Sequence, residues 1–267
     1  MAVSSYALKE KLGFSNIFKQ IKFTRDFLKE NPDYFRPDGL VIFCGPQGSG
    51  KTLSAVNYVY KLLSIYPRCK IVTNLDLTDY PFDNERVFLF QEAKDLTRYK
   101  NGKQGVIFLI DEIQLYFNSL GSKNIDIDVM TQIAQQRKQR IHIVATSQVF
   151  GRMAKPLREQ FDVVIYCEKK LFGFLQKNSL IDRNSIDGEE STGTNLKGTV
   201  KRTFRYFKNP LSFQRYDTYK VIENKNLKIE SKGVDIYDSE RRLSSNRWLY
   251  CYIVSYKFSY LFSIWDS

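Results

Sequence analysis

Runs of apolar residues along the chain predict a series of short buried strands. Six such runs, rich in β-branched and aromatic residues, lie at 40–44, 69–74, 86–90, 106–110, 141–145 and 163–167. Apolar residues at helical spacing predict helices at 53–63 and 125–140, a helix and loop at 91–105, and a turn or short helix at 156–160. Strands that alternate with helices indicate an α/β fold with a mostly parallel sheet flanked by helices.

The two ends of the chain follow other patterns. Residues 6–30 carry apolar side chains among charges, which predicts an amphipathic helix that we expect to pack on the core. Beyond 168, the alternation at 199–206 predicts a β-rich extension, with a flexible Gly/Ser/Thr-rich loop at 187–194. The predicted organisation has four parts: a helical lead-in at 1–38, an α/β core at 39–168, a basic β-rich extension at 169–247 and an aromatic tail at 248–267.

A glycine-rich loop joins the first core strand to the first core helix and fits the pattern G-x-x-x-x-G-K-[ST]. It has the sequence Gly45-Pro46-Gln47-Gly48-Ser49-Gly50-Lys51-Thr52, and Leu53 follows it in the helix. Its backbone N–H groups and the positive end of the helix are suited to phosphates, and Lys51 reaches the outer phosphates. We therefore expect a P-loop NTPase in which these nine residues bind ATP and Thr52 holds Mg²⁺. The sequence has no Asn-Lys-x-Asp guanine motif, which disfavours a GTPase.

Two later strands end in polar residues. Asp111 and Glu112 follow the run 106–110; Asp111 is expected to bind Mg²⁺, mostly through water, and Glu112 to activate the attacking water. We therefore expect the type of P-loop ATPase fold that has an additional core strand and an Asp-Glu pair. Gln148 ends the next strand and is a candidate to sense the terminal phosphate or align the water. A capping or turn role is the alternative for Gln148, and its chemistry alone does not decide.

The composition of the chain favours a negatively charged partner and excludes few classes of protein. The chain of 267 residues has 41 Lys and Arg and a formal net charge of +12, which favours an anionic partner, either nucleic acid or a membrane surface, although solubility alone is an alternative. The four cysteines are scattered, so neither a zinc site nor a disulfide framework is indicated. His142 lies in an apolar run and is interpreted as a strand residue. The first 22 residues lack a continuous apolar segment, so we expect a cytoplasmic protein.

Several motifs in order give the chain a family resemblance. They are the P-loop at 45–52, Val72-Thr73-Asn74-Leu75, Leu109-Ile110-Asp111-Glu112-Ile113-Gln114, Gln136-Arg137-Lys138, Thr146-Ser147-Gln148 and Arg158. Over about 38–170 the chain resembles the zonula occludens toxin family, which includes the filamentous-phage assembly ATPases and belongs with the FtsK/HerA-type DNA-pumping enzymes. The resemblance implies a cytosolic ATPase, often oligomeric and membrane-associated, that drives phage assembly or DNA export. Many members have Arg-His where this chain has Arg137-Lys138.

An oligomeric ATPase is expected to use an arginine finger from a neighbouring subunit. Arg158 is the first candidate by position, and Arg137, Arg140 and Arg152 remain open. The expected partners are further copies of the chain, single- or double-stranded DNA, phage coat or assembly proteins, and a membrane surface.

Two basic, aromatic segments are candidates for those partners. Lysines and arginines between 169 and 208 are interleaved with Phe204, Tyr206 and Phe207, and we expect alternation to place charges and aromatics on opposite faces, with the charges toward DNA. The tail at 248–265 follows three arginines; a membrane span, a buried element and a surface-lying segment all fit it.

The sequence thus predicts a Mg²⁺-dependent ATPase of phage or mobile-element origin that powers DNA packaging, DNA export or virion assembly. A nucleotide or small-molecule kinase and a non-hydrolysing, ATP-gated scaffold are the alternatives. Retention of Glu112 disfavours the scaffold, and the combination of Asp111, Glu112 and Gln148 disfavours the kinase.

Overall fold

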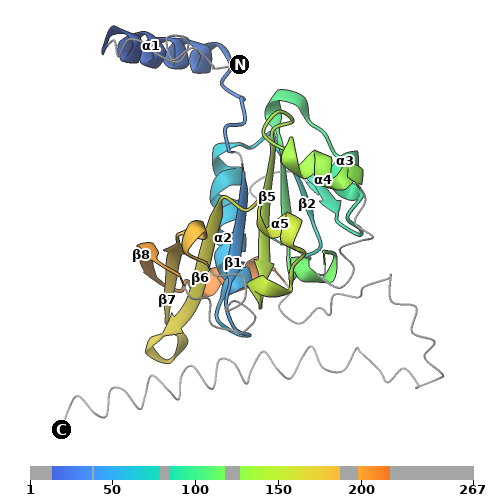
Figure 1. The fold of residues 1–267 in the computed structure, drawn as a ribbon, viewed down its shortest axis with the longest axis vertical. Coiled ribbons are helices and arrows are strands. Elements are labelled where there is room, and N and C mark those ends of the chain that lie inside the picture. Colours follow the sequence, from blue (N-terminus) through green and yellow to red (C-terminus); the bar gives the residue numbers. More distant parts are fainter. Residues whose placement is uncertain (1–13, 38, 79–83, 118–126, 187–197, 217–267) are drawn as a thin grey trace, which may run out of the picture. The chain divides into compact units, whose positions relative to one another are not determined.

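The core of the fold is an eight-stranded sheet with the order β3-β2-β4-β5-β1-β6-β7-β8 (Figure 1). The computed structural model describes residues 14–37, 39–78, 84–117, 127–186 and 198–216. The strands are β1 (Leu40–Cys44), β2 (Lys70–Thr73), β3 (Val87–Leu89), β4 (Val106–Ile110), β5 (Ile141–Ser147), β6 (Val163–Lys170), β7 (Leu175–Ile181) and β8 (Val200–Phe207). Strands β1 to β6 pair in parallel, while β7 and β8 are antiparallel additions at one edge, so the predicted mostly parallel sheet is confirmed.

The strand order brings the polar strand ends together. β5 lies between β1 and β4, so one additional strand separates the P-loop strand from the strand that ends before Asp111. In parallel pairing the carboxyl ends of β1, β4 and β5 share one edge of the sheet. The residues that follow these three strands therefore lie close to one another.

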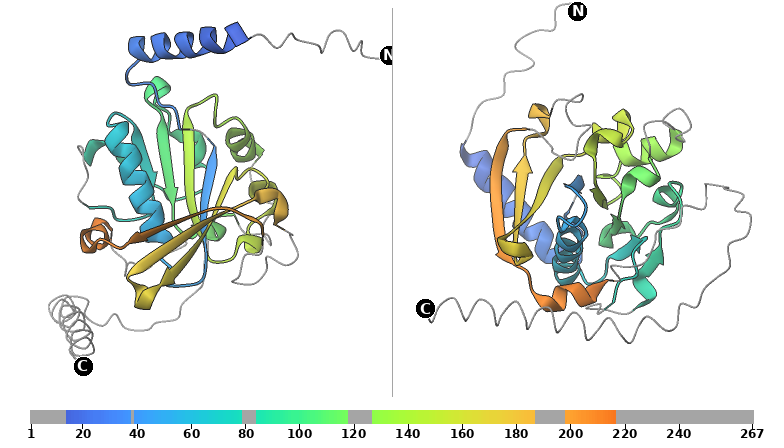
Figure 2. Two further views of the ribbon diagram at one scale, coloured as in Figure 1. Left: turned by 90° about the vertical axis from the view of Figure 1, so that its left-hand side faces the viewer. Right: turned by 90° about the horizontal axis from the view of Figure 1, so that it is seen from below.

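Helices cover both faces of the sheet, as predicted (Figure 2). On one face α2 (Lys51–Ile65) packs on alternate strand residues such as Val41, Phe43 and Ile107. On the other face lie α3 (Asp95–Arg98), α4 (Ile127–Ala134) and α5 (Lys155–Arg158), with buried contacts to Leu40 and Ile42. The central strands are apolar on both faces, which is why their sequences are continuous apolar runs.

The helix predicted at 125–140 is shorter in the structure. α4 ends at Ala134, and turns follow until Arg140, whose φ of 57° is left-handed. The backbone N–H of Ile141 donates to the carbonyl of Gln136 over 3.0 Å. The chain has to reverse here to begin β5 in parallel with β1, and a helix continued to 140 would not allow that reversal.

The amino-terminal helix is present, but its expected packing is wrong. α1 spans Phe14–Glu30, and Phe18 and Phe23 are 73% and 72% exposed. Phe27, one of its better-covered side chains, meets the ring of Tyr34 edge-on, with 4.9 Å between centroids. Among the described residues no helix is long and apolar enough to span a membrane. The predicted loop at 187–194 and the tail at 248–267 lie outside the described residues.

Candidate nucleotide-binding site

The P-loop connects β1 to α2 through a backbone that requires glycine. Gly48 and Gly50 have φ values of 70° and 89°, a left-handed conformation that costs other residues free energy. A Cβ on Gly50 would also lie 2.3 Å from Oε1 of Gln176, so a larger residue does not fit. α2 begins at Lys51 without a side-chain cap. Its first N–H groups and positive dipole end are thus suited to an anion.

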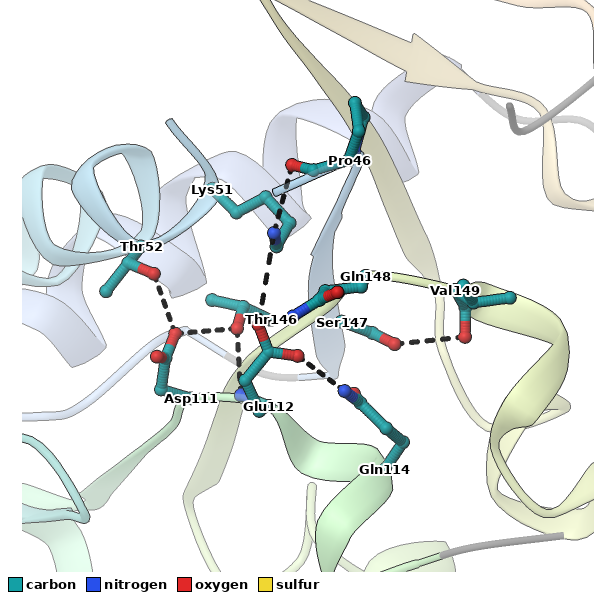
Figure 3. Close-up of polar contacts among 10 residues, drawn as sticks. All are labelled: Pro46, Lys51, Thr52, Asp111, Glu112, Gln114, Thr146, Ser147, Gln148 and Val149. Carbon is teal, nitrogen blue, oxygen red and sulfur yellow. Dashed lines mark hydrogen bonds and ion pairs between the residues drawn. The ribbon is translucent and has the colours of Figure 1, made fainter. Parts of the chain in front are cut away.

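Lys51 lies across the mouth of this loop (Figure 3). Its side chain is only 6% exposed, and Nζ donates to the carbonyl oxygen of Pro46 over 3.2 Å. The same Nζ lies 3.9 Å from Oε1 of Glu112. The ammonium group is therefore held between the P-loop and the acidic end of β4, as its predicted contact with phosphates requires.

Asp111 is tied to the P-loop helix and to β5 by two hydroxyl groups. Thr52 Oγ1 and Thr146 Oγ1 both donate to Asp111 Oδ1, over 2.8 and 2.7 Å. Burial raises the pKa of Asp111, and these two hydrogen bonds lower it in part. The carboxylate is consequently held in place by neutral donors, with no arginine or lysine bonded to it among the described residues.

The donor set at this position fits magnesium. Mg²⁺ prefers oxygen ligands and keeps several waters, using one or two protein groups together with substrate phosphates. Thr52 and Asp111 supply a hydroxyl and a carboxylate oxygen within hydrogen-bond distance of each other. Within the described ranges no group of three or more His, Cys, Asp or Glu could form a complete protein cage for a metal. A metal here would need the nucleotide to complete its ligands.

Glu112 has an unusual backbone that aims its carboxylate across the site. Its φ and ψ are 51° and 53°, and its N–H donates to Thr146 Oγ1 over 2.9 Å. Oε1 accepts a hydrogen bond from Gln148 Nε2 over 3.1 Å, and Oε2 accepts one from Gln114 Nε2. The structure thus brings together Lys51, Glu112 and Gln148, three of the four residues predicted to be catalytic.

Arg158, the fourth residue predicted to be catalytic, does not contact the other three. It ends α5, and its guanidinium makes no hydrogen bond or ion pair with any described residue of the site. Of the other candidates, Arg137 lies 3.6 Å from Asp162, and Arg140 stacks over the ring of Tyr34 with 4.2 Å to the centroid. None of these contacts involves the P-loop of the same chain.

Asn74 belongs to the site, although in the sequence it stood out only as part of the motif Val72-Thr73-Asn74-Leu75. Its Nδ2 donates to the carbonyl of Asp111 over 2.9 Å, and its Oδ1 accepts from the N–H of Asp111 over 2.8 Å. This two-point contact fixes the backbone at the end of β4. A polar residue directly after a buried parallel strand is the signal that could have identified Asn74.

The β-rich extension supplies further residues that were missed. Gln176 of β7 is fully buried, and its Nε2 donates to the P-loop carbonyl of Ser49 over 3.0 Å. Asn178 Nδ2 donates to Ser54 Oγ over 3.1 Å, and Tyr206 OH lies 3.0 Å from the same oxygen. These polar strand residues gave no local signal, because their partners are distant in sequence.

The expected separation of charges and aromatics on β8 is wrong. Arg202 lies over the ring of Phe204, 5.0 Å from its centroid, so the two share a face. Tyr206 is directed toward α2 through Ser54 and is not a free stacking platform. The basic and aromatic side chains of β8 therefore do not separate by type: Tyr206 contacts the helix after the P-loop, whereas Arg202 and Phe204 stack on each other.

The strand order, the P-loop and the acidic end of β4 define a P-loop NTPase fold. The family model for Zonular occludens toxin (Zot) matches residues 39–242, and the chain belongs to the Zot family. The match confirms the resemblance seen in the sequence and continues beyond 170 into the extension.

Among solved structures, the chain is similar to the N-terminal domain of zonular occludens toxin from Neisseria meningitidis, with 17% identity and a TM-score of 0.46; the match covers 68% of this chain and 100% of that chain. It is also similar to the genome packaging NTPase B204 from Sulfolobus turreted icosahedral virus 2 in complex with ATP-gammaS, with 11% identity, a TM-score of 0.41, and coverage of 61% and 96%. No curated protein matches the sequence. The family assignment rests on the family model alone.

Proposed function

We propose that this protein is a Mg²⁺-dependent ATPase that works as an oligomer on phage or mobile-element DNA, in packaging, export or virion assembly. The observation that carries the proposal is the convergence of Lys51, Thr52, Asp111, Glu112 and Gln148 at one edge of the sheet. ATP would supply the phosphoryl group that is transferred to water, and Mg²⁺, when bound, would neutralise the charge of the phosphates.

The chain's own residues divide the work of hydrolysis. Thr52 and Asp111 would hold the metal, and the ammonium of Lys51, which donates to Pro46 in the free protein, would contact the outer phosphates. Glu112 would orient the attacking water and accept its proton on a carboxylate oxygen, as the water oxygen bonds to the terminal phosphorus and the bond to the leaving ADP breaks. Gln148 Nε2 already donates to that carboxylate, so it fixes the direction in which the base faces.

Steady-state ATP hydrolysis tests the proposal, measured alone and with single-stranded or duplex DNA. Glu112→Gln should lower kcat by about 10²- to 10⁴-fold, the usual contribution of a general base. Lys51→Ala should abolish nucleotide binding. Glu85→Gln removes an exposed carboxylate elsewhere and should leave turnover unchanged.

The outcomes separate the alternatives. Stimulation by DNA supports a motor and identifies the preferred strand. Nucleotide binding without hydrolysis, in every oligomeric state, would replace the ATPase with an ATP-gated scaffold. Turnover that persists in Glu112→Gln would remove the base from its proposed role.

A basic cavity supports DNA as the partner. It has a volume of about 460 Å³ and is lined by Tyr34 and by four cations: Lys100, Lys103, Lys138 and Arg140. The cations precede β4 and β5, at the edge opposite the nucleotide site. None of them forms an ion pair within the described part of the chain. Such a cluster is suited to the phosphates of a nucleic-acid backbone.

Charge neutralisation tests the cavity separately from the ATPase. Lys100→Gln combined with Lys138→Gln should weaken DNA binding and reduce the salt dependence of log K by about 0.7 to 0.9 for each phosphate that the protein no longer neutralises. Lys22→Gln with Lys61→Gln removes two exposed charges from helix surfaces and is the control. Equal salt slopes for the two double variants would exclude the cavity from DNA binding.

A further inference from the structure

One face of the antiparallel strands lies against the P-loop. Lys169 of β6, Gln176 of β7 and Tyr206 of β8 are paired in register, so their side chains share that face. Gln176 donates to Ser49 of the loop, and Tyr206 contacts Ser54 of α2. The position of Lys169 is thereby fixed relative to the loop.

The ammonium group of Lys169 lies over the turn of the P-loop. A Cβ on Gly48 would lie 3.6 Å from Lys169 Nζ, and no other atom is within 4 Å of that position. Gly48 is within the stretch whose N–H groups are suited to phosphates. Lys169 Nζ is therefore close to the part of the loop that is proposed to bind the phosphates.

A second lysine, Lys208, directly follows β8 and comes two residues after Tyr206. The N–H of Lys208 donates to the carbonyl of Phe174 over 2.9 Å. Burial lowers the pKa of Lys208, and the positive charge of Lys169 lowers it further. The two ammonium groups thus repel each other in the free protein.

No acid among the described residues compensates this pair. The nearby carboxylate of Glu168 points to the opposite face, where Lys177 and Lys170 bind it over 2.7 and 3.1 Å. Neither Lys169 nor Lys208 forms an ion pair within the described ranges. Two like charges that are held together and left uncompensated favour binding of an anion.

A buried hydroxyl of the loop also lacks a partner. Ser49 Oγ has no hydrogen bond, although Ser49 is only 2% exposed. It lies 2.8 Å from the place where a Cβ on Gly45 would be. The hydroxyl is therefore a donor of the loop that no described residue uses.

We propose that Lys169 and Lys208 form a second cationic contact for the nucleotide phosphates, supplied by the β-rich extension in addition to Lys51 of the P-loop. This inference rests on the proposed nucleotide-binding function. The extension would then take a direct part in sensing the nucleotide. When the negative charge of the terminal phosphate is lost, the positive charges of Lys169 and Lys208 are again without a compensating anion.

Calorimetric titration with Mg-ATP and Mg-ADP at two salt concentrations tests the inference. Lys169→Gln should weaken Mg-ATP binding about tenfold, the effect of one charge-assisted hydrogen bond, and Lys208→Gln should weaken it as well. Lys169→Arg should restore most of the affinity. Lys170→Gln, next in the chain but on the opposite face, is the matched control and should bind like the wild type.

The results separate this inference from the function on which it rests. If Lys51→Ala loses binding while Lys169→Gln and Lys208→Gln stay within twofold of the wild type, the second cationic contact is refuted and the P-loop function stands. If the wild type itself binds neither nucleotide, both fail. A weaker salt dependence of Mg-ATP affinity in Lys169→Gln than in the wild type would confirm that Lys169 acts on the nucleotide through its charge.

Discussion

The left-handed backbone of Glu112 leads to a prediction about protein stability that does not depend on enzymatic activity. Glu112 has φ 51° and ψ 53°, a left-handed conformation that costs an L-residue about 1–2 kcal/mol relative to the right-handed one. The chain turns here directly after β4, between the backbone contact of Asn74 with Asp111 and the 3-10 turn Ile113–Leu115. The proposed catalytic carboxylate is thus aimed at the expense of stability.

Comparison of Glu112→Ala with Glu112→Gly isolates that cost. Both variants remove the carboxylate and its hydrogen bonds with Gln114 and Gln148, so their difference reports the backbone alone. Alanine retains the left-handed cost of about 1–2 kcal/mol, whereas glycine avoids it but loses about 0.5–1 kcal/mol through unfolded-chain entropy. Glu112→Gly should be the more stable by about 0.5–1 kcal/mol. For a chain of this size that is about 1–4 °C in Tm.

Thermal unfolding of the two variants, without nucleotide, measures the difference. Glu159 provides the matched control, since it is exposed and its φ of −68° is right-handed. There the order should reverse, with Glu159→Ala more stable than Glu159→Gly. If Glu112→Ala proves as stable as Glu112→Gly, the left-handed strain at the site does not exist and the argument fails.

Three further predictions concern the site. Burial raises the pKa of Asp111 in the folded protein above its ordinary value of 3.8. In the nucleotide-free wild type, the contribution of Asp111 to stability is therefore lost as pH rises from 3.8 through the raised pKa. Asp111→Asn should remove this pH dependence and raise the Tm of the nucleotide-free protein at neutral pH. The variant should also lose the rise in Tm that Mg-ATP causes in the wild type. A Tm below that of the nucleotide-free wild type at neutral pH would contradict the reasoning. Asn74→Ala should lower the free energy of unfolding in urea by about 1–3 kcal/mol, because it leaves two partly buried backbone groups of Asp111 unpaired. An unchanged midpoint would exclude this. Arg158→Ala and Lys51→Ala proteins, each inactive alone, should regain ATPase activity when mixed if Arg158 acts on a neighbour's nucleotide, and no recovery would remove that role.

The central strands could be predicted closely from the sequence. The apolar runs at 40–44 and 106–110 coincide with β1 and β4, because strands buried on both faces admit few polar residues. Parallel strands share a carboxyl edge, so polar residues that follow such runs are expected to meet. That reasoning alone is enough to place Asp111, Glu112 and Gln148 beside the P-loop.

The antiparallel edge could not be predicted in the same way. β7 has the sequence Leu-Gln-Lys-Asn-Ser-Leu-Ile, in which Gln176 and Asn178 are buried although they are polar. Their burial is compensated by Ser49 and Ser54, more than a hundred residues away. A local pattern of apolar residues contains no information on such distant partners. The packing expected for α1 was wrong for a related reason, since amphipathic spacing predicts a helix but not what covers it.

The two sides of the P-loop are held by different kinds of contact, and this bears on where the functional unit ends. On the β4 side, the contacts of Thr52 with Asp111 involve the groups that are proposed to exchange hydrogen bonds for metal ligands. On the β7 side, Gln176 binds the carbonyl of Ser49 and fills the space next to Gly50, neither of which a nucleotide would displace. Strand β7 therefore maintains the shape of the loop, while the acidic side is the one proposed to carry out the chemistry. Since β7 and β8 complete the same sheet as the P-loop strand β1, these two strands of the extension and the P-loop core form one structural unit around the proposed nucleotide site.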